Sequence, residues 1–335
     1  DTMNLASISA YEQELTDETN RRILYAQILN YGAYALIVIM IGIVYWVYRK
    51  YDKELTPDFD GDYFRELPSD ETPGEVSYLY YEKKIPDEAF TATLLDLIRK
   101  KYVTLEYSPD ELTDKNPNFT FVLDESKDQA SLQEHERYLI NWIFKSIARS
   151  NKVMISTIES YGKKSVNAAE QFQRSAKEFV RAIKRSGEKR KYFDQGVQGS
   201  KKQALAFLIL PIAFLLMTFF ISSAYVVEAT FAYLSSISLI VLYTLYVSTI
   251  KRKTQMGANL FARWKAFKKF LLDFSQMQDY PIPGIIVWEH FLVYATVLKC
   301  ADQVMEQLKV KLPNVAYEDS EGTFMAMGYR HNGFY

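Results

Sequence analysis

Cysteine and histidine are scarce in this 335-residue chain, which holds one cysteine, Cys300, and three histidines. A single cysteine excludes an internal disulfide and fits a reducing compartment for most of the mass. The sequence also lacks a P-loop, a glycine-rich dinucleotide turn, a Cys/His metal spacing and a nucleophile elbow. We therefore predict that the protein is not an enzyme and uses no cofactor and no metal.

Two of the histidines stand in contexts that favour structural roles. His135 lies between two glutamates at a polar helix start, which predicts a solvated surface side chain. Glu289 and His290 are adjacent, and adjacent side chains on a helix do not face each other, so they do not share an acid–base site. A buried polar pair that anchors a terminal helix is the preferred interpretation.

Ionisable residues are almost absent from three apolar stretches, residues 28–48, 204–227 and 229–250. At about 1.5 Å per residue, the first stretch covers about 30 Å, the thickness of a hydrocarbon core. These stretches predict an integral membrane protein with three transmembrane helices. A soluble core hairpin made of the last two stretches is the alternative, and their near-complete lack of charge argues against it.

The net charge of −1 hides a block pattern. Residues 1–48 carry five acidic and two basic side chains, residues 49–72 eight and four, and residues 73–125 eleven and six. The sign reverses in residues 126–203, with 17 basic and 8 acidic side chains, and residues 251–335 carry 11 basic and 8 acidic ones. Such blocks predict two faces with different partners.

Basic residues also flank the predicted spans on one side. Before the second span lie Lys189, Arg190, Lys191, Lys201 and Lys202, and after the third lie Lys251, Arg252 and Lys253. Because Lys and Arg near span ends favour the cytoplasm, residues 49–203 and 251–335 are predicted to be cytoplasmic and residues 1–27 to lie outside. The sequence begins Asp-Thr-Met without a signal peptide, so we expect a fragment that lacks its natural N-terminus.

The first cytoplasmic region begins with an acidic linker, residues 49–72, and continues with a unit of mixed structure at 73–125. Pro86 opens a helix whose apolar face carries Phe90, Leu94, Leu97 and Ile98. Alternating apolar residues then predict two strands, at 103–107 and 119–123, with 108–118 between them and a short helix at 75–83 before them. This order is typical of a winged helix with 108–118 as the wing. The predicted fold is an α-helical membrane protein with three transmembrane helices and a cytosolic, mostly α domain that contains a winged-helix-like α+β unit.

Winged helices often bind DNA, but the charge of this unit argues against that function. DNA binding depends on the neutralisation of phosphates by Lys and Arg. The candidate wing carries Asp110, Glu111 and Asp114 against Lys115 alone. A protein-interaction or structural module is the preferred interpretation, and nucleic acid is not an expected partner.

The next region, residues 126–203, is basic and helical, with helices expected at 131–150 and 163–186. Its candidate interaction residues are Lys177, Arg181, Lys184, Arg185, Lys189, Arg190 and Lys191. A solvated helix face is the first interpretation. Attraction to anionic lipid headgroups is the second, at about 1 kcal/mol per basic residue near the surface.

After the third span, residues 251–312 predict amphipathic and docking helices, followed by a tail at 313–335. The aromatic face there consists of Trp264, Phe267 and Phe270, beside the basic Lys268. This pattern fits a helix in the membrane interface, and it fits equally a face packed onto the cytosolic domain. Residues 285–298, which include Trp288, form an apolar stretch too short for a span and are expected to dock under the membrane hairpin.

Three ordered segments resemble a known family. Residues 90–106 (FTATLLDLIRKKYVTLE) are similar to "TATLLDLARRGYLxIE", residues 264–274 (WKAFKKFLLDF) to "WxxFxxFLxDF", and residues 288–295 (WEHFLVYA) to "WExYLVYA". These are segments of the domain of unknown function 2207 family, the YciQ-like predicted bacterial membrane proteins. The resemblance covers residues 28–312. The chain departs from the family pattern at Lys101 and at Lys299-Cys300, where many relatives have glycine, and this departure concerns local turn geometry.

The resemblance implies a bacterial cell membrane location and an exported N-terminal domain of which residues 1–27 would be the membrane-proximal end. It supplies no established activity. It implies a LemA-type membrane protein as a candidate partner, because genes of the two families often lie side by side.

The function expected from these observations is that of a scaffold or signalling protein, which couples an exported domain to a cytosolic protein-interaction module and contacts membrane lipids. A subunit of a homo-oligomeric channel or transporter is the alternative, although only Pro211 interrupts a span and intramembrane charges are missing. A membrane-tethered DNA-binding regulator is the second alternative.

Overall fold

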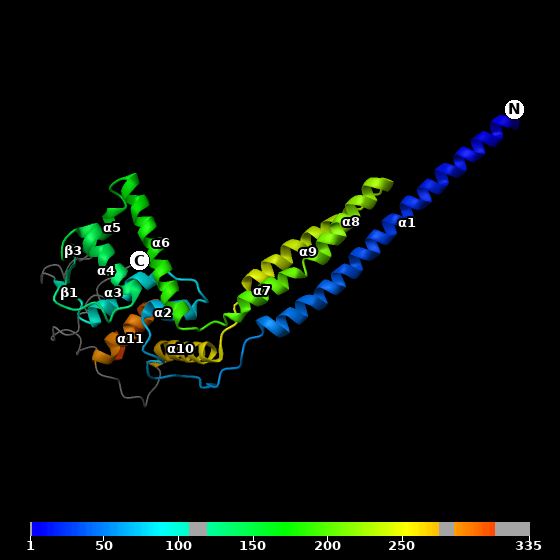
Figure 1. Cartoon of the computed structure of the whole chain (residues 1–335). Helices are drawn as coiled ribbons and strands as arrows, with labels where there is room; N and C mark the ends of the chain where they lie inside the picture. The colour runs from blue at the N-terminus through cyan, green and yellow to red at the C-terminus, as the bar shows by residue number, and fades with distance from the viewer. Residues whose placement is uncertain (1, 107–118, 275–284, 312–335) are drawn as a thin grey trace. The chain divides into compact units, whose positions relative to one another are not determined.

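The computed structural model describes residues 2–106, 119–274 and 285–311, and these residues are mostly helical (Figure 1). The chain divides into two compact units. Unit 1 consists of Asp1–Leu55 and Asp194–Arg252, and unit 2 of Thr56–Phe193 and Lys253–Tyr335. The predicted wing and the predicted tail lie outside the described residues.

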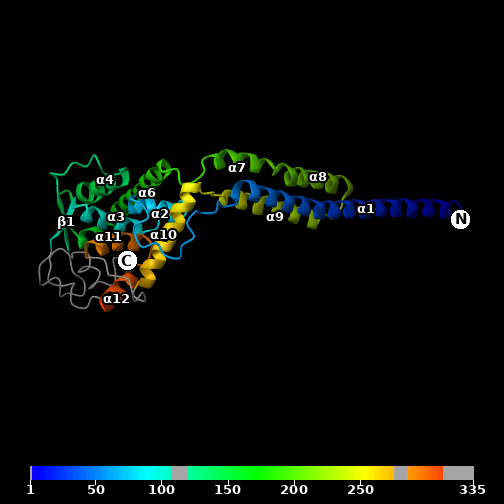
Figure 2. The same cartoon turned by 90° about the horizontal axis from the view of Figure 1, so that it is seen from below.

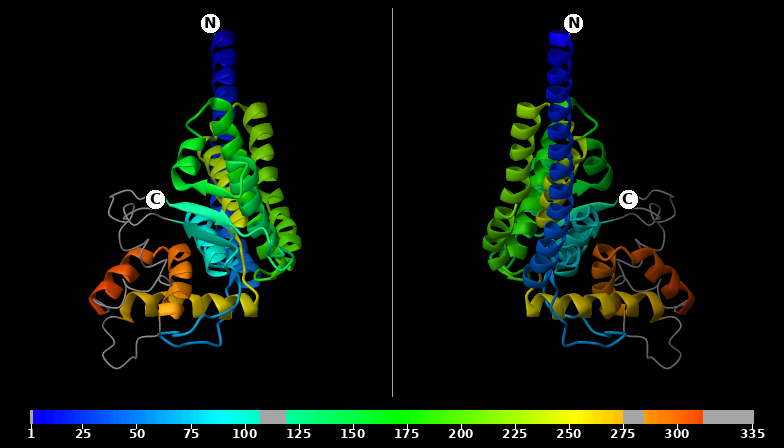
Figure 3. Two further views of the ribbon diagram at one scale, coloured as in Figure 1. Left: turned by 90° about the vertical axis from the view of Figure 1, so that its left-hand side faces the viewer. Right: turned by 90° about the vertical axis from the view of Figure 1, so that its right-hand side faces the viewer.

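Unit 1 contains the three predicted spans. Its elements are α1 (Thr2–Val47), the π-helical turn η1 (Tyr48–Asp52), α7 (Gly196–Ala206), α8 (Ile209–Tyr225) and α9 (Thr230–Thr249). By length and apolar composition, Ser7–Asp52, Gly199–Tyr225 and Thr230–Thr249 are each able to cross a membrane, which confirms the number and positions of the expected transmembrane helices. The first helix begins well before its apolar part, and α1 continues beyond the end of the α8–α9 hairpin (Figures 2 and 3).

The three spans pack through small residues and rings. Leu29 and Ala33 of α1 are buried against Ala232 of α9, and a Cβ atom on Gly32 would lie 2.9 Å from the ring of Phe214. Pro211 lies in the first turn of α8, directly after the break at residues 207–208, where a missing N–H leaves no helical hydrogen bond unmade. The proline therefore marks a helix start within the span.

Unit 2 is built from helices around a small sheet. Its elements are α2 (Pro73–Tyr80), α3 (Glu88–Arg99), β1 (Val103–Glu106), β2 (Thr120–Leu123), α4 (Glu134–Ile140), the π-helical η3 (Asn141–Ala148), β3 (Lys152–Met154), α5 (Ile155–Tyr161), α6 (Val166–Lys189), α10 (Gln255–Asp273), α11 (Ile285–Val297) and α12 (Ala301–Lys311).

The sheet is antiparallel with the order β1-β2-β3. The alternation of apolar residues predicted the strands β1 and β2, and in the sheet Val103 pairs with Leu123 and Leu105 with Phe121. The strand β3 was not predicted, because a strand that runs only from Lys152 to Met154 carries too little periodicity.

The aromatic face of α10 is inside unit 2. Trp264, Phe267, Phe270 and Trp288 are at most 1% exposed. The Phe267 ring lies 5.1 Å from the Phe291 ring of α11, and α11 in turn packs against α3 and α2. A membrane or interaction surface made of these four side chains is therefore wrong, and the alternative of packing onto the same domain holds. The physical reason is that α11 offers an apolar partner that removes these rings from water.

Two lysines occupy the backbone conformation that favours glycine. Lys101, after α3, has φ 61°, and Lys299, after α11, has φ 59°. Both lie where the sequence analysis expects a difference in local turn geometry. Lys101 is exposed, so its side chain contributes no packing that would offset the cost of a left-handed conformation for a residue with a Cβ atom.

Lys101→Gly is therefore expected to raise the free energy of unfolding of unit 2 by about 0.5–1 kcal/mol. The measurement is urea denaturation of the full chain in detergent, followed by tryptophan fluorescence. Lys84→Gly, at an exposed position of ordinary φ, is the matched control and should lower stability. A loss of stability in both variants would contradict the prediction.

Candidate functional site

Residues 56–64, here named the strap, lie along α10 rather than free in solvent (Figures 1 and 3). At one end of the helix, the side-chain N–H of Gln255 donates to the Thr56 carbonyl at 2.9 Å. One turn further, the backbone N–H of Asp58 donates to Asn259 Oδ1 at 2.9 Å, and Asn259 Nδ2 donates to Asp58 Oδ2 at 2.6 Å. The first part of the predicted linker is thus bound to unit 2.

The strap is also held at the other end of α10. Lys269 Nζ lies 2.9 Å from Asp62 Oδ1, and the Tyr63 hydroxyl donates to Asp273 Oδ2 at 3.0 Å. The hydrogen bond to Asp273 raises the pKa of Tyr63. An extended chain of this length spans about 23 Å at about 3.3 Å per residue, and the helix between the first and last contacts spans about 27 Å. The two lengths match closely enough for contacts at both ends.

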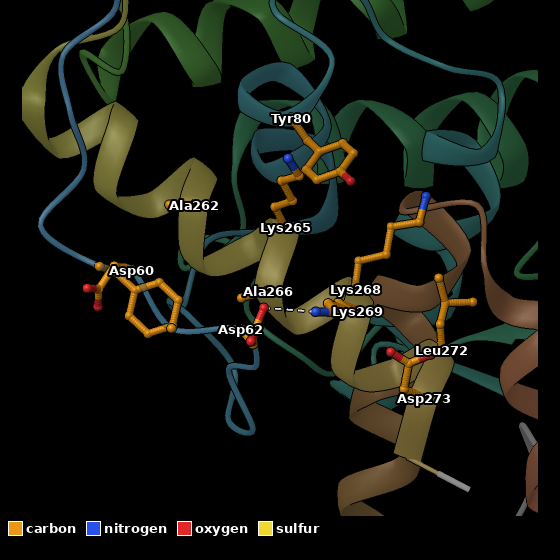
Figure 4. A pocket seen from close by; sticks show the side chains of 12 residues that line it. Asp60, Asp62, Tyr80, Ala262, Lys265, Ala266, Lys268, Lys269, Leu272 and Asp273 are labelled. Carbon is orange, nitrogen blue, oxygen red and sulfur yellow. Dashed lines mark hydrogen bonds and ion pairs between the residues drawn. The ribbon is translucent and has the colours of Figure 1, made fainter. Parts of the chain in front are cut away.

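A cavity of about 620 Å³ lies between the strap and α10 (Figure 4). Strap residues 59–62 form one wall, and Tyr80 of α2 forms another. Lys265, Lys268 and Lys269 project from α10 into the lining. Of these three lysines, only Lys268 was predicted as a candidate interaction residue; the three-residue and four-residue spacing of the lysines was the available signal.

The lysines of the cavity differ in their partners. Lys269 is paired with Asp62, and the hydrogen bond to Asp62 raises its pKa. Lys265 is exposed and Lys268 is half-buried, and neither forms an ion pair with the residues that the structure describes. Lys268 Nζ stands 5.8 Å from the centre of the Tyr80 ring. Within the part of the chain that the structure describes, two cations of the cavity are therefore outside any ion pair.

A network of buried polar residues joins α2, α4 and α6. His135 is 0% exposed. Its Nε2 lies 3.1 Å from Thr72 Oγ1, and its Nδ1 lies 3.1 Å from Ser186 Oγ. The expectation of a solvated surface histidine is therefore wrong. His135 lies in the first turn of α4 between two glutamates, and these polar neighbours suggested exposure. The ring points instead toward Gly74, where a Cβ atom would come within 2.9 Å of Nε2.

Glu75 is the charged centre of this network. Its carboxylate, 1% exposed, receives Arg190 Nε at 2.8 Å and Nη2 at 3.0 Å. The Thr72 backbone N–H also donates to it at 3.0 Å and closes a capping box at the start of α2. Arg190 was predicted as part of an interaction or membrane surface; its guanidinium is instead bound by a carboxylate in the protein.

Two further carboxylates surround Lys100. Its Nζ lies 2.7 Å from Asp96 Oδ2 and 2.6 Å from Glu136 Oε1. Burial disfavours the charge of Lys100, but the two carboxylates outweigh burial and raise its pKa. Because Asp96 and Glu136 are each 1% exposed, the group links α3 to α4 and leaves no free charge for chemistry.

The remaining predicted basic residues lie on α6 or directly after it. Lys177, Arg181, Lys184, Arg185, Lys189 and Lys191 are exposed. Glu178 binds Arg181 at 3.1 Å and Arg185 at 2.8 Å, and Lys189 Nζ lies 3.9 Å from Glu134 Oε2. Hydrogen bonds from the two arginines lower the pKa of Glu178. This is the solvated face that the sequence predicts, with Lys177 and Lys184 outside any ion pair among the described residues.

Other titratable residues named from the sequence are removed from solvent. His290 is half-buried with its ring 5.5 Å from that of Tyr294, and burial lowers its pKa to about 4. Burial raises the pKa of the Cys300 thiol to about 12, which excludes a reactive thiolate at neutral pH. Among the described residues no cluster of three His, Cys, Asp or Glu side chains is able to hold a metal ion.

Comparison with known proteins gives one match. A family model described as "Predicted membrane protein (DUF2207) C-terminal domain" matches residues 60–308, which include the strap from Asp60 onward and all of the cavity lining on α10. No curated protein and no solved structure shows significant similarity to the chain.

Acidification is expected to destabilise unit 2 through His135. Burial lowers its pKa from 6.5 to about 4, so between these pH values the unfolded chain binds a proton that the folded chain does not. Stability is therefore complete above about pH 6.5 and falls by about 3 kcal/mol as the pH decreases to about 4. Urea denaturation of the full chain in detergent between pH 7 and pH 4 measures this slope.

The matched variant is His135→Gln, which is expected to be less stable at pH 7 but to show a shallower slope below pH 6.5. His290→Gln isolates the contribution of the second histidine with a lowered pKa. Equal slopes in the wild type and in His135→Gln would show that His135 is not the responsible group.

Loss of the strap contacts is expected to expose the strap to protease. Asn259→Ala with Lys269→Ala removes three polar contacts at the two ends, and a hydrogen bond is worth about 0.5–1.5 kcal/mol. An opening free energy lowered by about 1–2 kcal/mol corresponds to tryptic cleavage after Arg65 that is about 5- to 30-fold faster. Lys177→Ala with Lys184→Ala should leave this cleavage rate unchanged. Equal rates in both double variants would mean that the contacts do not hold the strap.

Proposed function

The chain belongs to the DUF2207 family of predicted membrane proteins, and on that premise we propose that it is a bacterial cell-membrane scaffold or signalling protein. In this proposal an exported region acts through α1 on unit 2, and unit 2 is a cytosolic module that binds a protein partner. A LemA-type membrane protein is the candidate partner.

The distribution of cations over unit 1 supports this orientation. The C-terminal ends of α1 and α9 and the start of α7 lie at the same end of the unit, since Tyr51 donates to Gln203 at 3.1 Å and Arg252 donates to the Lys50 carbonyl at 3.2 Å. The basic residues at this end are Arg49, Lys50, Lys53, Lys201, Lys202, Lys251 and Arg252. Basic residues beside span ends favour the cytoplasm, and all three chain connections to unit 2 leave from this end.

The contacts of the strap are the observation that supports coupling between α1 and α10. Only residues 53–55 separate η1 from the strap, and the strap is bonded to α10 at both ends. A displacement of α1 therefore reaches α10 through a short and anchored connection instead of a long flexible linker. The coupled element, α10, carries the aromatic core of the unit on its other face.

The order of strands and helices supports a winged-helix-like module whose elements are circularly permuted along the chain. A winged helix runs helix, strand, helix, helix, strand, wing, strand, and its first strand pairs with its last. Here α2, α3, β1 and β2 come first, and α4 with β3 follow, while β3 still pairs with β2. The strand order β1-β2-β3 is the one expected of a winged helix whose first helix and strand are moved to the end of the chain, which supports the proposal.

A protein partner is favoured over DNA by the position of α3. In this scheme α3 is the recognition helix, which must be free to enter a major groove. It packs instead against α11, with Ala92 and Leu97 fully buried. The excess of acidic over basic side chains in residues 73–125, eleven against six, acts in the same direction.

The test is a pull-down of the full-length protein from its native membrane in mild detergent, with mass spectrometry of the intact complex. We expect a stoichiometric protein partner. In Asp58→Asn with Asp62→Asn, which weakens the strap, the partner's occupancy should change at least threefold. Glu125→Gln with Glu159→Gln, two exposed carboxylates away from the strap, is the control of equal charge.

Three outcomes decide the proposal. A partner whose occupancy responds to the strap variant and not to the control supports it. An equal response in both variants refutes coupling through the strap. A homo-oligomer without any partner refutes the scaffold and moves the weight to the channel or transporter, for which ion flux into liposomes is the next measurement.

A further inference from the structure

The cavity between the strap and α10 has the size of a small-molecule site. Its volume of about 620 Å³ falls within the range of about 300–1,000 Å³ that is typical of ligand pockets. The strap forms a wall that is bonded to α10 on both sides of the cavity. A polymer therefore has no open path through it while the strap is bound, whereas a small molecule fits beneath it.

The cavity is lined by three lysines and three aspartates, and two of the lysines stand outside the ion pairs of the described residues. The carboxylate of Asp62 is engaged by Lys269, and that of Asp273 accepts the Tyr63 hydroxyl. Lys265 and Lys268 are three residues apart on one face of α10, close enough to contact the same group. Both side chains extend from α10 toward Tyr80 (Figure 4). Lysine is a common phosphate ligand, and a phosphate bound there would be attracted by both ammonium groups. Asp60 stands apart from them in Figure 4.

The walls of the cavity add an aromatic surface. The Tyr80 ring borders the cavity and is backed by the rings of Phe261, at 5.6 Å, and Tyr81, at 5.1 Å. Phe59 of the strap borders the cavity as well. Stacking of a base on an aromatic side chain is worth about 1–3 kcal/mol. A ring held in place by neighbours is a suitable stacking platform, because little conformational freedom is lost on binding.

We propose that this cavity binds a small molecule that carries both a phosphate group and an aromatic ring, the chemical class of a nucleotide. Lys265 and Lys268 contact the phosphate, and Tyr80 contacts the ring. A ligand in this position touches the strap and α10 together and therefore stabilises the strapped state. The inference goes beyond the proposed function and does not rest on it, since binding is measured without a partner protein.

The experiment is a fluorescence titration of the full-length protein in neutral detergent with trinitrophenyl-ATP, with displacement by unlabelled ATP. We expect saturable binding that ATP reverses. Lys265→Ala with Lys268→Ala should weaken the affinity at least tenfold, and Tyr80→Ala at least threefold. The control Lys177→Ala with Lys184→Ala removes the same charge from exposed positions on α6 and should change the affinity by less than twofold.

A second measurement reads the strap directly. Saturating ATP should slow tryptic cleavage after Arg65 at least threefold in the wild type and not in the Lys265→Ala, Lys268→Ala variant. This readout remains informative if the fluorescent group itself binds to detergent.

The contrary outcomes are distinct. Absence of ATP-reversible binding, or equal weakening in both lysine double variants, overturns the site. Displacement by inorganic pyrophosphate as effective as that by ATP overturns the nucleotide class, because the ring would then contribute nothing. Displacement by vesicles that contain phosphatidylglycerol, but not by ATP, assigns the cavity to a lipid headgroup and also overturns the proposal.

Discussion

The arrangement of unit 2 depends on the ion pair between the buried carboxylate of Glu75 and Arg190. The carboxylate is 1% exposed and binds the guanidinium of Arg190 with two hydrogen bonds, so it ties the start of α2 to the end of α6. Removal of Arg190 would leave the buried carboxylate of Glu75 without its charged partner, and a buried group that loses its hydrogen bonds destabilises the fold. His135 extends the connection to α4 through Thr72 and Ser186. These helices therefore cannot separate one at a time, and the sheet and α11 pack against a fixed frame.

Much of this fold could be predicted where apolar residues recur at one regular spacing or fill a long stretch without interruption. The three spans are long and almost free of charge, and no soluble element competes with that pattern. The helix before β1 and the strands β1 and β2 follow from the spacing of apolar residues. The expected departures in turn geometry also have a physical meaning, since Lys101 and Lys299 adopt the left-handed backbone that glycine tolerates.

The candidate site could not be predicted in the same way, because it depends on residues that lie far apart in the sequence. A histidine between two glutamates gives no sign that helix α6 will cover it with Ser186. Asp58 and Asp62 resemble any acidic linker until their partners, Asn259 and Lys269, are known. The aromatic face of α10 could be predicted, but the sequence left two partners for it, a membrane and the rest of the protein. Only the position of α11 decides between them. The local pattern of apolar residues predicts helices and strands. Which polar groups become buried depends on tertiary contacts between distant residues.

The length of α1 has a mechanical consequence. At about 1.5 Å per residue a helix of 46 residues is about 69 Å long, which is more than twice the hydrocarbon thickness of about 30 Å. Its backbone hydrogen bonds run without interruption from Thr2 to Val47, so the helix behaves as a stiff rod in both compression and torsion. Sliding by one residue moves its end by about 1.5 Å, and a rotation of about 100° gives the next residue the same direction. The π-helical turn at Tyr48–Asp52 is the first change of helical geometry along this rod, so a displacement of the rod along its axis moves that turn by the same distance.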